Sequence, residues 1–145
     1  MQLINNEIWK SKQTIDQLNT TSQNTLVSTL EIKFTQITDN TLVATMPVNS
    51  KHHQYMGILH GGASVALAET VGSAAAKMCV QNGYCVGIEI NANHLKSVKE
   101  GLVTATATPF HIGKATQVWE IKITNEAGQL ICISRLTMAN QYHSI

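Results

Sequence analysis

The sequence predicts an α+β fold in which an antiparallel β-sheet wraps around one long central helix. Two observations lead to this expectation. One alanine-rich segment, residues 63–80, is apolar on almost every side, as a helix buried against a sheet is. Most of the remaining chain alternates β-branched and polar residues, which is typical of half-buried strands. At 145 residues, the chain suits a single domain spanning residues 1–145.

The N-terminal part is expected to hold a short helix and two strands. Ile15 and Leu18 lie three residues apart in a weakly amphipathic segment, so we predict a short helix over about residues 8–20. The segments 26–37 and 41–48 both alternate β-branched and polar residues. We therefore predict a strand in each of them, joined as a hairpin.

Four more strands are expected after the central helix, which we predict to end at Gly83. Each segment either alternates or is rich in β-branched residues. The separators are residues 100–101, 111–114 and 125–128, each of which contains a glycine suited to a turn. The predicted strands span residues 85–98, 102–110, 116–124 and 129–139.

The composition limits the classes of partner. The formal net charge is +1 and no run of Lys or Arg occurs, so we expect no nucleic-acid partner. The longest apolar segment carries Glu69 and Lys77, so we expect no membrane span. Only 13% of residues are charged, and this low share suggests that another subunit covers part of the surface.

The cysteines and the N-terminus predict a cytoplasmic protein. Cys79, Cys85 and Cys132 form no CxxC pair and lie in apolar stretches, so we expect buried, reduced thiols. The first twelve residues lack the apolar core of a signal peptide.

His60-Gly61-Gly62, directly before the central helix, is the first candidate for a chemical role. The glycines let a ligand approach the backbone closely, and the first N–H groups of a helix point outward. A carbonyl oxygen placed there meets backbone donors and the positive end of the helix dipole. A flexible hinge between loop and helix is the alternative interpretation.

Glu69 is the second candidate, because a carboxylate in the middle of an apolar helix is costly to bury. Glu69, Ser73 and Lys77 are spaced four residues apart and so share one helix face. Facing a cleft, Glu69 is suited to act as a general base or a nucleophile. The alternative is an ordinary solvated polar stripe.

Other kinds of site find no support in the sequence. No cluster of His, Cys and acidic residues has the spacing of zinc ligands. We expect His52 and His53 to lie in a surface loop and to be solvated, not to bind a metal. No G-x-S-x-G elbow or phosphate-binding glycine loop occurs. We therefore expect no metal and no cofactor.

Several segments together resemble hotdog-fold thioesterases of the 4-hydroxybenzoyl-CoA (Arthrobacter) type. The resemblance is strongest to the branch that contains 1,4-dihydroxy-2-naphthoyl-CoA hydrolase and the enterobactin proofreading thioesterase. It runs from about residue 8 to residue 140. The matching segments are IWK (8–10), QYMGILHGGAS (54–64), LAETVGS (67–73), GIEINANH (87–94), PFHIG (109–113), QVW (117–119) and SRLT (134–137).

The resemblance implies a hotdog fold and roles for particular residues. Glu69 is implied as the nucleophile or general base, and Gly61 as the donor of a backbone N–H to the thioester oxygen. Gln54 and His60 are implied to orient the thioester, and Ser73 to position the water or the Glu69 carboxylate. The residues implied to bind coenzyme A are Gly87, His94, Lys96, Ser97, His111, Gly113, Lys114 and Thr116.

The expected function is hydrolysis of an acyl-CoA, with an aromatic acyl group such as 1,4-dihydroxy-2-naphthoyl. Alternatives are proofreading of an acyl or aryl carrier protein and a non-catalytic acyl-CoA-binding hotdog domain. A hotdog dehydratase is a further alternative, but only His60 of its pattern is present. Tyr55, where relatives tend to have Pro, and the connection 81–84 depart from the family and bear on the acyl pocket.

We also predict an oligomer with shared active sites, a homodimer or a dimer of dimers. Gly61 and Glu69 are eight residues apart, which along a helix corresponds to roughly 12 Å. Glu69 therefore cannot reach a carbonyl held at the Gly61 end of its own helix. A second chain with its helix antiparallel brings its own glutamate level with Gly61.

Overall fold

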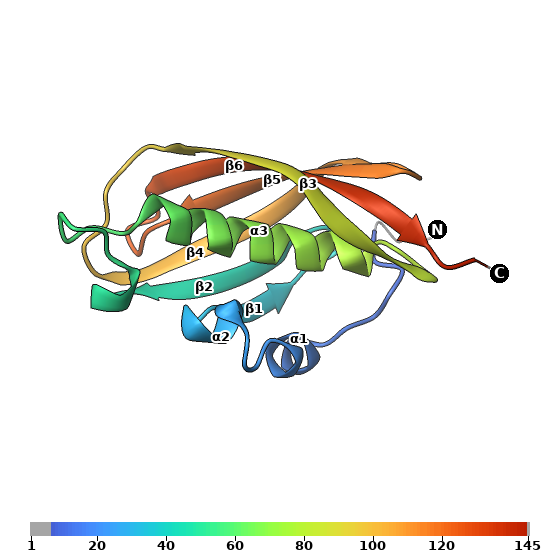
Figure 1. The fold of residues 1–145 in the computed structure, drawn as a ribbon, viewed down its shortest axis with the longest axis horizontal. Coiled ribbons are helices and arrows are strands. Elements are labelled where there is room, and N and C mark those ends of the chain that lie inside the picture. Colours follow the sequence, from blue (N-terminus) through green and yellow to red (C-terminus); the bar gives the residue numbers. More distant parts are fainter. Residues whose placement is uncertain (1–6, 145) are drawn as a thin grey trace, which may run out of the picture.

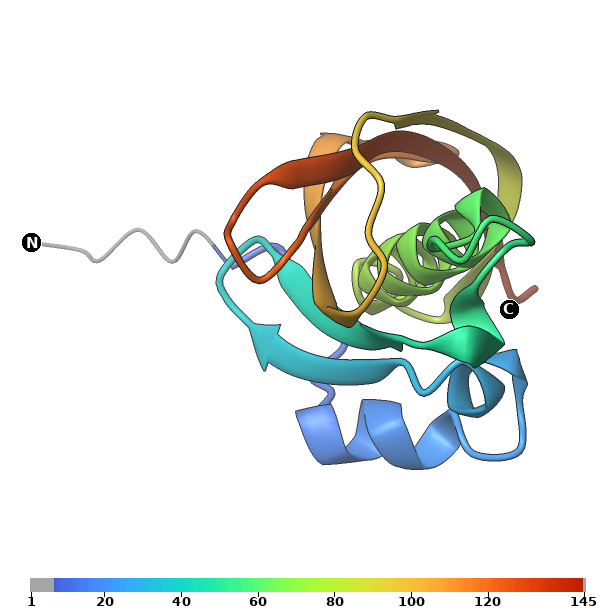
Figure 2. The ribbon, with the colours of Figure 1, turned by 90° about the vertical axis from the view of Figure 1, so that its left-hand side faces the viewer.

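The computed structural model describes residues 7–144, and it confirms the predicted architecture (Figure 1). Within that range a six-stranded antiparallel sheet has the order β1-β2-β4-β5-β6-β3. Figure 2 shows one long helix, α3, inside the curve of this sheet. The strands are β1 (Lys33–Ile37), β2 (Leu42–Val48), β3 (Gly83–His94), β4 (Gly101–Ile112), β5 (Thr116–Thr124) and β6 (Leu130–Tyr142).

Helix α3 (Gly61–Met78) is the core element, and it ends five residues before the glycine predicted to stop it. Its small and aliphatic residues fit closely against the sheet. A Cβ atom at Gly72 would lie 2.6 Å from Leu136 and 3.1 Å from Ile121, so only glycine fits there without movement of its neighbours. The buried side chains of α3 and of the strands form one continuous core.

The strand predicted over residues 26–37 is wrong in its first half. Residues Leu26–Thr29 form a short helix, α2, and only Lys33–Ile37 form β1. Thr25 caps α2: its hydroxyl accepts a hydrogen bond from the Val27 N–H, and Ser28 completes a capping box. The alternation of apolar residues did not reveal this local capping, which favours a helical turn over a strand.

The other boundaries differ by a few residues. The predicted N-terminal helix shortens to α1 (Ile15–Thr21), which begins at a Thr14 capping box. Strand β3 stops at His94, so residues 95–98 form a loop and not the strand end that was predicted. Strands β4 and β6 run on to Ile112 and Tyr142, beyond their predicted ends.

Strand β3 lies at one edge of the sheet, beyond β6, and its other side has no neighbouring strand in the described chain. It carries three large exposed apolar side chains near its start, Tyr84, Val86 and Ile88. Exposed, apolar edge strands tend to pair with another chain. No helix within residues 7–144 has the length and apolar character needed to cross a membrane.

Candidate active site

The N-terminus of α3 presents one backbone donor that its own cap does not use. His60 is the N-cap, and its Nδ1 accepts the Gly62 N–H at 2.8 Å. The N–H groups of Ala63 and Ser64 both donate to the His60 carbonyl. As the first helical residue, Gly61 has no helical acceptor for its own N–H. Among the first four donors of α3, the Gly61 N–H is therefore the one that remains for a ligand.

His60 thus acts first as a helix cap. Because its Nδ1 accepts a hydrogen bond, the proton of the neutral ring lies on Nε2. The backbone N–H of His60 donates to His52 O at 2.8 Å, which ties the loop before α3 to the 3-10 turn η1 (Ser50–His52). The predicted contact of His60 with a thioester stays a prediction.

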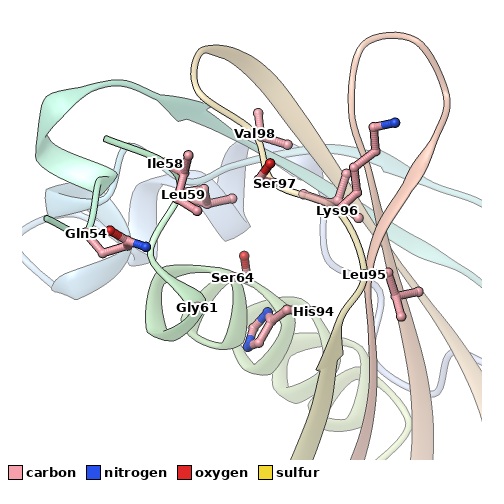
Figure 3. Close-up of a pocket in the computed structure, with 11 residues that line it drawn as sticks. Gln54, Ile58, Leu59, Gly61, Ser64, His94, Leu95, Lys96, Ser97 and Val98 are labelled. Carbon is pink, nitrogen blue, oxygen red and sulfur yellow. The ribbon is translucent and has the colours of Figure 1, made fainter. Parts of the chain in front are cut away.

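A cavity of about 330 Å³ opens in front of Gly61 (Figure 3). Its wall comes from four parts of the chain: the loop before α3, the first turn of α3, the end of β3 with the loop that follows, and the start of β6. The lining residues are Gln54, Ile58, Leu59, Gly61, Ser64, His94, Leu95, Lys96, Ser97, Val98 and Ile131. Two of the predicted catalytic residues, Gln54 and Gly61, therefore share this cavity with three predicted coenzyme A ligands, His94, Lys96 and Ser97.

Gln54 is oriented by its own loop. Its Oε1 accepts the Met56 N–H, and its backbone N–H donates to Ile58 O at 2.9 Å. Gly57 makes this turn possible with a φ of +74°, a left-handed conformation that favours glycine. Since Oε1 is engaged, the Nε2 amide is the end of Gln54 that is suited to bind an acceptor in the cavity.

His94 packs directly against Gly61. A Cβ atom at Gly61 would lie only 2.8 Å from His94 Nε2, so the absence of a side chain allows the ring to approach the backbone. His94 was predicted as a coenzyme A ligand. The structure places its ring beside the Gly61 backbone, and its predicted contact with coenzyme A stays a prediction.

Ser64 is a cavity residue that the sequence did not single out. It is buried, and Figure 3 shows its hydroxyl on the side of α3 that faces the 95–98 loop. It follows Gly61 by three residues, so both lie on the same helix face. The three-residue spacing from Gly61 was the sequence feature from which this position of Ser64 could have been predicted.

Glu69 lies outside the cavity. It is exposed, two turns along α3, and its Oε1 lies 3.0 Å from the position that a Cβ atom of Gly87 would occupy. In one chain Glu69 is therefore exposed and not part of the cavity wall, as the alternative of a solvated polar stripe expects, and its catalytic role stays a prediction. Gly87 leaves room for Glu69 beside β3, and its predicted contact with coenzyme A stays a prediction.

The predicted polar stripe on α3 is present and faces β3. Ser73 is half-buried, and its hydroxyl lies 3.7 Å from the Met138 sulfur, a contact on the sheet side. Lys77 Nζ donates to Gly83 O at 2.7 Å. Ser73 has no hydrogen bond to Glu69 within the described residues, so its predicted positioning role stays a prediction.

The remaining coenzyme A candidates lie at the other end of the molecule. His111 lies near the end of β4, Gly113 and Lys114 lie in the turn that follows, and Thr116 is the first residue of β5. Figure 1 shows this turn at the same end of the molecule as the C-terminal end of α3. The next residue, Gln117, donates to Ala76 O near the end of that helix, at 3.0 Å. One chain therefore does not bring the predicted coenzyme A ligands together.

The cysteines are not nucleophile candidates. All three are free thiols, two of them buried and Cys85 half-buried. Burial raises the pKa of Cys79 to about 12 and raises the pKa of Cys85 and Cys132 as well. The thiols are thus protonated at neutral pH and unreactive. The cytoplasmic location stays a prediction.

Comparison with known proteins gives a consistent picture. The family model described as "Thioesterase superfamily" matches residues 56–132. A 1,4-dihydroxy-2-naphthoyl-CoA hydrolase of Escherichia coli is 50% identical over 133 residues, which is 91% of this chain and 98% of the relative. A proofreading thioesterase of Cronobacter turicensis is 48% identical over 133 residues, covering 91% of this chain and 97% of the relative. A crystal structure of a thioesterase from Haemophilus influenzae has a TM-score of 0.91 and 45% identity, covering 93% of this chain and 95% of that chain.

Proposed function

The chain belongs to the thioesterase superfamily and is a thioester hydrolase, and on this premise we propose that it hydrolyses an aryl-coenzyme A such as 1,4-dihydroxy-2-naphthoyl-CoA. The products are the free acid and coenzyme A. Support for this acyl group comes from the E. coli relative of that name, which is similar over almost its whole length. The observation that carries the chemistry is the Gly61 N–H, left free by the His60 cap and opening on the cavity.

Gly61 and Gln54 stabilise the negative charge that develops on the thioester oxygen. The Gly61 N–H donates from the positive end of the α3 dipole, and Gln54 Nε2 is suited to add a second hydrogen bond. Donors that are already in position when the charge appears contribute the most to such reactions. Because the thiolate of coenzyme A is a good leaving group, the reaction requires no strong general acid.

The Glu69 carboxylate acts either as the nucleophile or as the general base. In one route its carboxylate oxygen bonds to the carbonyl carbon, the C–S bond breaks, and coenzyme A leaves as the thiolate. Water then hydrolyses the resulting anhydride. In the other route Glu69 removes a proton from a water molecule, whose oxygen attacks the same carbon, and the C–S bond then breaks and releases the coenzyme A thiolate. Both routes need a carboxylate next to the carbonyl that Gly61 holds.

That carboxylate comes from a second chain. Within one chain Glu69 is roughly 12 Å along α3 from Gly61 and is not part of the cavity wall. If two α3 helices lie antiparallel, the partner's Glu69 comes level with Gly61 of the first chain. Each dimer then contains two equivalent sites, as a twofold axis requires.

The edge strand β3 supports this arrangement. It is twelve residues long, and its outer edge has no neighbouring strand among residues 7–144. Its Gly87 lies next to Glu69. Pairing β3 antiparallel with the same strand of a second chain covers that edge. Since α3 packs along β3, the same pairing sets the two helices antiparallel. The resemblance to the family further implies that two such dimers associate.

A second candidate function is proofreading on an aryl carrier protein, favoured by the similarity to the Cronobacter enzyme. The test is a comparison of kcat/KM for 1,4-dihydroxy-2-naphthoyl-CoA, benzoyl-CoA, an aliphatic acyl-CoA and a benzoylated aryl carrier protein. The proposal expects the aryl-CoA thioesters to be the best substrates. If the carrier protein has the highest kcat/KM, the second function is correct, and a preference for aliphatic acyl-CoA contradicts both.

A further inference from the structure

A buried hydrogen-bond network joins the end of α3 to the turn between β4 and β5. Gln117 is fully buried, and its Nε2 donates to Ala76 O at 3.0 Å and to Asn140 Oδ1 at 2.9 Å. Its Oε1 accepts the Trp119 Nε1–H at 3.0 Å. Asn140 Nδ2 in turn donates to Gly113 O at 2.9 Å and to Lys114 O at 3.1 Å. We call these two side chains the Gln117–Asn140 network.

The partners of the network allow only one orientation of both amides. The Trp119 ring can only donate, so it fixes the oxygen of Gln117. The carbonyls at both ends can only accept, so they fix the nitrogens of Gln117 and Asn140. Every donor and acceptor of the two side chains is used, and a fully connected buried network of this kind holds its members rigidly.

The network acts on the backbone of the turn. The carbonyls of Gly113 and Lys114 point to Asn140 Nδ2, and the Ala115 carbonyl accepts the Asn140 N–H at 2.8 Å. Lys114 O also accepts the Tyr142 hydroxyl at 2.9 Å. In a planar trans peptide the N–H points opposite to the C=O. The N–H groups of Lys114 and Ala115 therefore point away from Asn140.

The outer side of this turn has the chemistry of an anion site. Two successive N–H groups face the same way, as in the backbone concavities that bind phosphate. Lys114 on this turn and Thr116 at the start of β5 are both exposed. The His111 ring folds over Gly113, so closely that a Cβ atom there would lie 2.5 Å from His111 Nε2.

We propose that Asn140, oriented by Gln117, is a positioning residue that sets the 113–115 turn to bind the phosphate groups of coenzyme A. The proposal rests on the proposed function, which supplies the ligand. In an antiparallel pair with the partner's Glu69 level with Gly61, the partner's Ala76 lies seven residues further on, about 10 Å past Gly61. The turn beside Ala76 is thus placed for the distal part of a coenzyme A whose thioester is at Gly61.

The alternative is that the network only stabilises the fold. Two substrates distinguish this stabilising role from the positioning of a phosphate-binding turn. The same acyl group is offered on coenzyme A and on pantetheine, which lacks the nucleotide and its phosphates. We expect Asn140→Ala to raise KM for the acyl-CoA about tenfold, the effect of losing one strong hydrogen bond, while kcat is unchanged. The kcat/KM for the acyl-pantetheine should equal that of the wild type.

Asn125→Ala is the matched control. Asn125 holds the turn between β5 and β6 in a similar way, with its Oδ1 accepting the Gln129 N–H at 2.9 Å. Losing it should lower the unfolding temperature without changing KM for the acyl-CoA. If Asn140→Ala lowers kcat/KM equally for both substrates, or leaves KM for the acyl-CoA unchanged, the proposal is wrong.

Tyr142→Phe covers the case in which Asn140→Ala does not fold. It removes one donor to Lys114 O from an exposed side chain, so the fold is kept. KM for the acyl-CoA should rise about twofold, and an unchanged KM overturns the proposal. The wild type separates the two levels of inference. If the wild type has equal kcat/KM on both substrates, the phosphate contact alone is wrong. If the wild type hydrolyses neither substrate, both the proposed function and the positioning role are wrong.

Discussion

The two ends of α3 are built in opposite ways. At the N-terminal end the helix opens on a cavity of about 330 Å³, and the Gly61 donor has no helical acceptor. At the C-terminal end Ala76 O accepts from Gln117, and the network behind it is closed and buried. The polar groups of the C-terminal end have their hydrogen-bond partners within the chain. In the proposed dimer, the Gly61 N–H at the other end binds the substrate.

Burial also differs between the two kinds of polar group. Gln117 carries no exposed surface, whereas Glu69, the predicted catalytic carboxylate midway along α3, is exposed in a single chain. A buried polar group must find its partners inside the fold, or folding becomes costly. A group with a partner in another molecule has to remain accessible. Substitutions of Gly61 and of the exposed Glu69 should therefore change the rate of hydrolysis more than the stability of the fold.

The largest effect is expected from Glu69→Gln. The amide keeps the shape of the side chain but cannot act as a base or a nucleophile, so kcat should fall at least about a hundredfold. The unfolding temperature should be unchanged, because the side chain is exposed. Glu120→Gln is the control, since it makes the same change next to Lys122 on the sheet. A Glu69→Gln enzyme with near wild-type kcat rules out this catalytic role.

Gly61→Ala should lower kcat by about tenfold to a hundredfold, within the range for a displaced oxyanion donor. The new methyl group meets His94 Nε2 at 2.8 Å, so the ring or the helix start has to move. Steady-state kinetics on an aryl-CoA measures the loss. In a His94→Ala background the same substitution should cost less, because the obstructing ring is gone. Equal losses in both backgrounds contradict the steric explanation.

The smallest effect is expected from the two lysines at opposite ends of α3. Lys96 lines the cavity, and Lys114 lies on the β4–β5 turn. If both bind phosphate as point charges, Lys96→Ala combined with Lys114→Ala should raise KM about tenfold at low salt and less at high salt, with kcat unchanged. A KM that does not change at low ionic strength removes both lysines from the site.

The sequence predicted the helix-and-sheet architecture because its patterns are local. Residues 63–80 are apolar nearly all round, and the alternation of the later strands is regular. The prediction was wrong at α2, where a Thr25 cap and a Ser28 hydroxyl decide the conformation. Strand alternation records which side chains become buried and carries little information on such caps.

For the site, the sequence identified Gly61 and Gln54, and the structure brings them to one cavity. It did not identify Ser64, nor the packing of His94 on Gly61. Such contacts join segments about thirty residues apart and depend on how β3 crosses α3. Nor did the sequence divide the coenzyme A candidates between the two ends of the molecule, since that division depends on the order of the strands.

The central claim is that each active site combines Gly61 of one chain with the partner's Glu69. It is tested by mixing two inactive variants, Gln54→Ala and Glu69→Ala, after reversible dissociation, and measuring hydrolysis of an aryl-CoA. In a mixed dimer one site carries both substitutions and the other carries neither. Random pairing makes half of the dimers mixed, so activity should return to about one quarter of the wild-type value. A mixture that stays inactive although mixed dimers form, or a wild type that is active as a monomer, contradicts the account.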